Sequence, residues 1–189
     1  MSFLTDFGDV AILLPLAVAI LVWLLAVRSH RAALWWLLAL GLSAGGIGLL
    51  KVYFVACASS GPLQSPSGHS GLSALVYGAL AALLATRVEG WRRVAALALC
   101  VLLVAGIAFS RLALGAHTPP DVAAGLLIGL AALAVFLLGS AGKLAPAASI
   151  RPLLLATIAV VAILHGDKLH AEALLHAVGL YLKSGSVCA

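Results

Sequence analysis

The sequence predicts an all-α, polytopic membrane protein, a bundle of about six transmembrane helices. Of its 189 residues, 64% are hydrophobic and 9% are charged, whereas a soluble domain has about 25% charged residues. The mean hydropathy is +1.20, and small side chains such as alanine and glycine, which let transmembrane helices pack closely, are abundant. We therefore expect a single membrane-embedded domain over residues 1–189 and no sizeable soluble domain.

Six apolar runs, separated by polar or small-residue connections, are expected to cross the membrane. They cover residues 10–27, 32–53, 68–85, 94–109, 120–138 and 152–164. A spanning helix needs about 20 apolar residues, so the last and shortest run must tilt or recruit residues 145–150 to cross. Residues 1–9 contain no basic residue, unlike a secretory signal, and the first run is therefore expected to be retained as a span behind a short leader.

Helix packing and the C-terminal end can also be predicted. The motifs Gly41-x-x-x-Gly45 and Gly125-x-x-x-Gly129 predict faces where helices approach closely. Residues 168–183 place leucine, valine and tyrosine against charged side chains, a pattern typical of an amphipathic helix lying in the membrane interface. The C-terminal segment 167–189 is accordingly expected to be interfacial.

Basic residues are distributed unevenly over the connections, which predicts the orientation. One set lies in alternate connections: Arg28, Arg31, Arg87, Arg92, Arg93, Lys143 and Arg151. The opposite connections hold only Lys51, Arg111, Lys168 and Lys183. Because positive charge accumulates on the cytoplasmic side, we expect the second set to face the exterior, on the periplasmic side of a bacterial inner membrane.

Two short stretches carry most of the polar chemistry, Pro66–His69 and Ser110–Asp121. Titratable side chains at membrane depth are costly and by default mark a functional site. The orientation deduced from charge puts both stretches on the outer face, although the charge count did not require them to meet. The sequence therefore predicts one site at the outer ends of the helices.

The residue types at this site suit an anionic ligand. Ser67, Gly68 and His69 lie where a loop enters a helix, and the free N–H groups of a helix N-terminus attract anions. Lys51 and Arg111 add positive charge, and the planar guanidinium of arginine can hold two phosphate oxygens at once. We therefore expect a phosphate-sized anion to bind here.

His69, His117 and Asp121 add the groups that hydrolysis of a phosphate ester requires. One imidazole can attack phosphorus through a ring nitrogen while another protonates the leaving oxygen. A carboxylate beside the attacking ring fixes its tautomer and stabilises the resulting cation. Asp121 follows His117 by four residues across the start of a helix, a spacing that favours contact between them.

Together these residues resemble the signatures of the type 2 phosphatidic acid phosphatase (PAP2) superfamily of membrane lipid phosphatases. Pro66-Ser67-Gly68-His69 matches its second signature, and its third, Ser-Arg, five residues, His, three residues, Asp, is matched by Ser110, Arg111, His117 and Asp121. The resemblance covers residues 51–138, the expected phosphatase-like core. The first signature departs from the pattern. The family has a lysine, six intervening residues and then Arg-Pro, whereas here Lys51 is followed, after six residues, by Ala58-Ser59.

The resemblance implies a role for each residue. His117 would be the nucleophile that forms a phosphohistidine, Asp121 its partner and His69 the general acid. The phosphate would be bound by Lys51, Ser67, Gly68 and Arg111. It further implies a lipid phosphate or diphosphate as substrate, of the polyprenyl diphosphate or glycerolipid phosphate class, and a site at the outer leaflet that needs neither metal nor cofactor.

Two alternatives share these residues. A lipid hydroxyl could intercept the phosphohistidine, which would make the protein a lipid phosphotransferase, or the fold could bind or transport a lipid phosphate without catalysis. Nothing indicates nucleic-acid binding, and the oligomeric state is not predictable from the sequence. Cys57, Cys100 and Cys188 match neither a metal site nor a disulfide framework. Cys57 and Cys188 could pair if they lie on the same face of the membrane, but we expect all three to be small apolar side chains.

Overall fold

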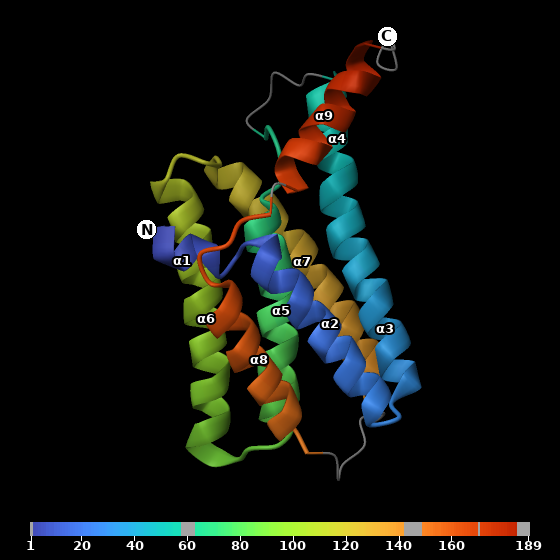
Figure 1. The fold of residues 1–189 in the computed structure, drawn as a ribbon, viewed down its shortest axis with the longest axis vertical. Coiled ribbons are helices and arrows are strands. Elements are labelled where there is room, and N and C mark those ends of the chain that lie inside the picture. The colour runs from blue at the N-terminus through green and yellow to red at the C-terminus, as the bar shows by residue number, and fades with distance from the viewer. Residues whose placement is uncertain (1, 58–62, 142–148, 170, 185–189) are drawn as a thin grey trace.

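The computed structural model of the chain describes residues 2–57, 63–141, 149–169 and 171–184 (Figure 1). All regular structure in these ranges is helical, which confirms the predicted fold class. The elements in order are α1 Ser2–Asp6, α2 Val10–Ala26, α3 His30–Leu40, the π-helical turn η1 Gly41–Gly45, α4 Gly46–Cys57, α5 Gly68–Ala85, α6 Gly90–Ala113, α7 Pro119–Ser140, α8 Arg151–Leu164 and α9 Ala171–Ser184.

Five stretches of the described chain are long and apolar enough to cross a membrane. They are Phe3–Ala26, His30–Cys57, Gly68–Ala85, Gly90–Ala113 and Pro119–Ser140, and they correspond to the first five predicted spans. Helix α8 has 14 residues, fewer than the roughly 20 that a spanning helix needs. Whether α8 crosses the membrane therefore stays a prediction.

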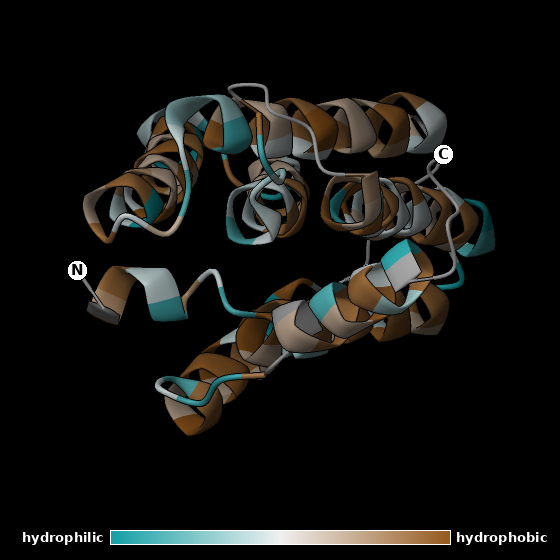
Figure 2. Ribbon diagram, turned by 90° about the horizontal axis from the view of Figure 1, so that it is seen from above, coloured by the Kyte–Doolittle hydropathy of each residue, from teal (hydrophilic) through white to brown (hydrophobic). Residues whose placement is uncertain are grey.

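The outer surface of the bundle matches a membrane environment. Hydrophobic residues are spread over the helices when the molecule is viewed from above (Figure 2). Large apolar side chains face outward, among them Leu49, 74% exposed, and Leu138, 79% exposed. A soluble monomer rarely exposes contiguous apolar surface on this scale, so these faces are expected to contact lipid.

Helix α5 is the centre of the bundle and packs against α2, α6 and α7. The α5–α7 contact is close enough that only glycine fits at three positions. A Cβ on Gly125 would collide with the backbone of Ser67, a Cβ on Gly129 with the backbone of Gly71, and one on Gly71 would lie 2.7 Å from the carbonyl oxygen of Gly125. The second glycine motif is therefore the packing face that the sequence predicted.

The first glycine motif is not a packing face, so that prediction was wrong. Gly41 and Gly45 are exposed, and a Cβ on either would have no neighbour within 4 Å. The motif instead coincides with η1, where α3 passes into α4. Glycines favour such a local change of helical pitch because they impose little steric restriction on the backbone.

The interior between α2, α3 and α7 is filled by large side chains. Trp36 is fully buried, its indole N–H donates to the carbonyl of Ala17 at 3.0 Å, and its ring meets Phe136 edge to face with centroids 5.2 Å apart. A buried indole needs such a hydrogen-bond partner. These contacts hold α2, α3 and α7 against one another and so position the polar residues at their ends.

The connections alternate between the two ends of the bundle. The turns that join α2 to α3 and α5 to α6 lie at the lower end in Figure 1, whereas α1, the α6–α7 connection and the start of α5 lie at the upper end. The stretches Pro66–His69 and Ser110–Asp121 therefore share the upper end, as predicted.

The C-terminal helix forms over most of the predicted amphipathic segment 168–183. Helix α9 packs along α4, with Gly179 against Val55, and its depth in a membrane interface stays a prediction.

Cys57, at the end of α4, is disulfide-bonded, so the expectation of a free apolar side chain was wrong at this position. Cys100 is free, as expected, and Cys188 lies outside the described residues.

Candidate functional site

The N-terminus of α5 is built around Ser67, which caps the helix. Its buried hydroxyl accepts hydrogen bonds from the hydroxyl of Ser70 at 3.0 Å and from the backbone N–H of Ser70 at 3.4 Å. Gly68 is the first residue of α5 and His69 the second. The sequence-based placement of this stretch at a helix N-terminus is confirmed, and the helix dipole there favours an anion.

Asp121 joins the two polar stretches. Its Oδ1 accepts from the backbone N–H groups of Gln64 and Ser65, each at 2.8 Å, and its Oδ2 accepts from the N–H of Thr118 at 3.0 Å. The backbone N–H of Ser67 in turn donates to the carbonyl oxygen of Asp121 at 2.9 Å. The loop before α5 and the start of α7 are thus held together through one residue.

The same carboxylate faces His117. Nδ1 of His117 lies 3.8 Å from Oδ2 of Asp121, and both side chains are almost fully buried, 6% and 3% exposed. This distance is longer than a hydrogen bond but short enough for strong electrostatic interaction in a buried setting. The residue spacing therefore predicted the right pair.

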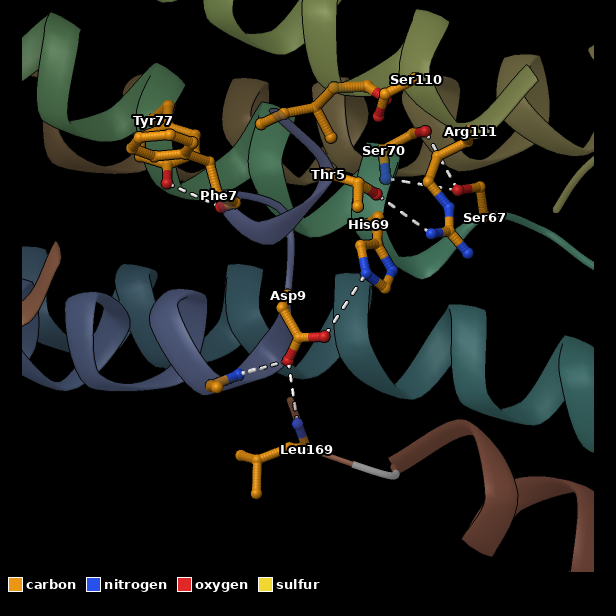
Figure 3. A network of polar contacts seen from close by, with 12 residues as sticks. Thr5, Phe7, Asp9, Ser67, His69, Ser70, Tyr77, Ser110, Arg111 and Leu169 are labelled. Atoms are coloured by element: carbon orange, nitrogen blue, oxygen red, sulfur yellow. Dashed lines mark hydrogen bonds and ion pairs between the residues drawn. The ribbon is translucent and has the colours of Figure 1, made fainter. Parts of the chain in front are cut away.

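His69 has a carboxylate neighbour that sequence reasoning missed. Nε2 of His69 lies 3.7 Å from Oδ2 of Asp9, the residue that caps α2 (Figure 3). Asp9 precedes His69 by sixty positions, so no local spacing pairs them. The available signal was topological, because an acidic residue directly before the first predicted span belongs to the same outer end as the site.

Arg111 lies in the last turn of α6 and reaches the same N-terminal segment. Its guanidinium Nη1 donates to the hydroxyl of Thr5 at 3.1 Å, and in the view of Figure 3 the guanidinium lies on the far side of His69 from Asp9. The segment from Thr5 to Asp9 therefore contacts both Arg111, which is expected to bind phosphate, and His69, the expected general acid.

Lys51 is buried, with 7% of its surface exposed, and does not extend to a surface. Its Cε lies 3.9 Å from the point where a Cβ of Gly68 would stand. Lys51, Gly68 and His69 line a cavity of about 200 Å³ whose other walls are mainly apolar, formed by Val10, Ala44, Ile47, Gly48, Leu72, Leu169 and Leu175. The cavity lies between α2, α4, α5 and the C-terminal segment.

All seven residues predicted for the site thus lie at one end of the bundle. Direct contacts connect Ser67, Asp121 and His117 in one part of the site, and Lys51, Gly68 and His69 share the cavity in the other. Positions 58 and 59, where the first signature has Arg-Pro, lie outside the described residues. The arrangement combines cationic groups, a helix N-terminus and two imidazoles. The first two can bind an anion, and the imidazoles can transfer protons or attack the bound group.

Comparison with known sequences agrees with this site. Residues 54–144, which contain both polar stretches, match the profile of the PAP2 superfamily. Over these residues, the chain is similar to the PAP2 superfamily.

One curated relative of the chain is an "Uncharacterized 22.5 kDa protein in cps region" of Klebsiella pneumoniae, 34% identical over 135 residues. The match covers 69% of the present chain and 65% of the relative, so the chain spans slightly less than two thirds of that protein. No solved structure matches the fold.

Proposed function

We propose that this protein is a metal-independent membrane phosphatase that removes a phosphate from a lipid phosphate or diphosphate through a phosphohistidine at His117. The observation that carries the proposal is the carboxylate of Asp121. It binds the loop before α5 by two hydrogen bonds and lies 3.8 Å from the ring of His117. The nucleophile of one signature is thereby held beside the helix N-terminus of the other.

The first half of the reaction forms the phosphohistidine. Nε2 of His117 attacks phosphorus, the bond between phosphorus and the leaving oxygen breaks, and His69 donates a proton to that oxygen. Asp121 beside Nδ1 stabilises the positive charge that the ring acquires. Lys51, Arg111 and the N–H groups at the start of α5 would balance the charge of the phosphoryl oxygens.

The second half releases phosphate. His69, now neutral, accepts a proton from water as the water oxygen attacks phosphorus, and the bond to His117 breaks. The enzyme returns to its starting protonation state, and the overall reaction consumes one water. A lipid hydroxyl in place of water would give phosphotransfer, which the experiment below distinguishes.

The cavity beside Lys51 and His69 supports a lipid substrate. Lys51 would bind the phosphate, while the apolar walls would surround the first carbon atoms of the tail. Mostly apolar walls with a few polar groups are typical of sites that bind small organic ligands. The substrate classes we favour are polyprenyl diphosphates and glycerolipid phosphates.

The charge distribution and Cys57 both support an outward-facing site in a bacterial inner membrane. The basic connections lie away from the site, which favours the cytoplasm for the opposite end. The disulfide-bonded Cys57 ends the helix that carries Lys51, and disulfides persist mainly in oxidising compartments such as the periplasm.

Phosphate release from purified protein in detergent tests the proposal. With chelator present, we expect release from phosphatidate and from a polyprenyl diphosphate but little from glycerol 3-phosphate, which has no tail. Because the nucleophile is lost, His117→Ala should lower kcat/KM at least about 10³-fold. Strict dependence on a divalent ion, or full activity of His117→Ala, would contradict the proposal. Transfer of phosphate to an added lipid alcohol, with no free phosphate, would identify a phosphotransferase instead.

A further inference from the structure

The carboxylate of Asp9 does more than cap a helix. Its Oδ1 accepts from the backbone N–H of Ala11 at 2.9 Å, the usual contact of an N-cap, and also from the N–H of Leu169 at 3.1 Å. An N-cap requires only one side-chain oxygen. The second oxygen, Oδ2, is directed at Nε2 of His69 at 3.7 Å (Figure 3).

The segment that carries Asp9 is held firmly against the site. The hydroxyl of Tyr77, in α5, donates to the carbonyl of Phe7 at 2.7 Å. Gly8 packs so closely that a Cβ there would lie 2.7 Å from Ile107 and 3.2 Å from His69. The orientation of Asp9 is therefore fixed by contacts with α5 and α6 in addition to its own hydrogen bonds.

The chain that follows α8 also contacts the N-terminal residues around Asp9. The ring of His165 lies against Phe3 and Phe7, with centroids 4.5 and 4.8 Å away, and the bond from Leu169 reaches Asp9 itself. Both side chains of the Asp9–His69 pair are mostly buried, 10% and 12% exposed. Charge interactions between buried groups are screened far less than those at a surface.

We propose that Asp9 is a positioning residue for His69: it orients the ring through Nε2 and stabilises its protonated form, so that Nδ1 can donate a proton to the leaving oxygen. The proposal rests on the proposed phosphatase function and adds a second carboxylate–imidazole pair to it. Proton and electrons balance as before. The Nδ1–H bond breaks, the proton joins the departing alkoxide, and the negative charge of Asp9 offsets the imidazolium until that transfer.

Substrates with different leaving groups test this role. An alkoxide, released from a short-chain phosphatidate, is a strong base and needs a proton as it departs. Nitrophenolate, released from p-nitrophenyl phosphate, is a weak base and departs without one. The ratio of kcat/KM for these two substrates reports proton donation in the first chemical step, and it does not depend on the fraction of protein that is folded.

Asp9→Asn keeps an oxygen for the cap and removes only the charge, because asparagine is also a good N-cap. We expect its kcat/KM for the phosphatidate to fall about 10- to 100-fold and that for p-nitrophenyl phosphate by less than about threefold. Asp9→Ser, which also caps but has no carboxylate, should give the same selective loss. Asp167→Asn removes the same charge at an exposed position and should change neither value.

Every other outcome overturns a defined part of the account. Unchanged activity of Asp9→Asn, or an equal loss with both substrates, would show that Asp9 is structural and would refute the positioning role while leaving the phosphatase intact. If the wild-type protein releases phosphate from neither substrate, or if His117→Ala remains fully active, the proposed function itself fails.

Discussion

The two histidine–carboxylate pairs at the site have nearly equal distances but different origins. The side chains of His117 and Asp121, four residues apart in sequence, lie 3.8 Å from each other. Those of His69, in α5, and Asp9, the N-cap of α2, lie 3.7 Å apart. The first pair follows from the geometry of one helix start, and the second exists only because the bundle folds. A local pair can thus be read from a sequence motif, whereas a tertiary pair requires the structure.

The pairs also differ in what else their carboxylates hold. Asp121 accepts hydrogen bonds from Gln64, Ser65 and Thr118 and so fixes the loop before α5. Asp9 accepts from Ala11 and Leu169 and so fixes the start of α2 and the C-terminal segment. We therefore expect Asp121 to serve the nucleophile and Asp9 the leaving group, with different kinetic consequences.

Asp121→Asn should have the largest effect among changes to the two carboxylates. We expect kcat/KM to fall about 10²- to 10⁴-fold for phosphatidate and p-nitrophenyl phosphate alike, because both reactions need the nucleophile that Asp121 stabilises. The side-chain NH2 group of the asparagine would also face at least one of the backbone N–H groups that donate to the carboxylate of Asp121. Because two donors cannot form a hydrogen bond, this should lower the free energy of unfolding by about 1.5–3 kcal/mol. Steady-state kinetics and denaturant unfolding measure the two effects. A selective loss with phosphatidate alone would contradict the assignment.

A smaller effect is expected from weakening the contact between α5 and α7, which brings the two histidine–carboxylate pairs to one site. Gly129→Ala places a Cβ against the backbone of Gly71 and should destabilise the protein by about 1–3 kcal/mol. Gly45→Ala is the matched control, because a Cβ there meets nothing within 4 Å. It should leave stability unchanged or raise it by up to about 1 kcal/mol. Equal effects of the two changes, in thermal or denaturant unfolding, would refute the packing role of Gly129.

Much of the fold followed from hydropathy, because apolar length determines which segments can cross a membrane. The start of α5 at Gly68 was predictable from local residue preferences, and the structure has it. The role of the first glycine motif was not, since Gly41 and Gly45 have the same spacing as a packing face but meet no partner. Spacing defines a face of a helix but not the neighbour it meets.

The same limit applies to the site. The two signature stretches identified His69, His117 and Asp121, and charge placed them on one side. Asp9 and Thr5 were not identified, because their contacts with His69 and Arg111 join elements far apart in sequence. The disulfide at Cys57 was considered but rejected for a similar reason. Cysteine pairing depends on which residues the fold brings within bonding distance.

The central claim is that His117 carries the phosphoryl group between substrate and water. Rapid quenching of the protein during turnover of a lipid labelled in its phosphate, followed by peptide mapping, tests it directly. We predict an acid-labile, base-stable label on the peptide that contains His117, and no label in His117→Ala. Label on another residue, such as Ser67, or turnover by His117→Ala without any labelled protein, would contradict the account.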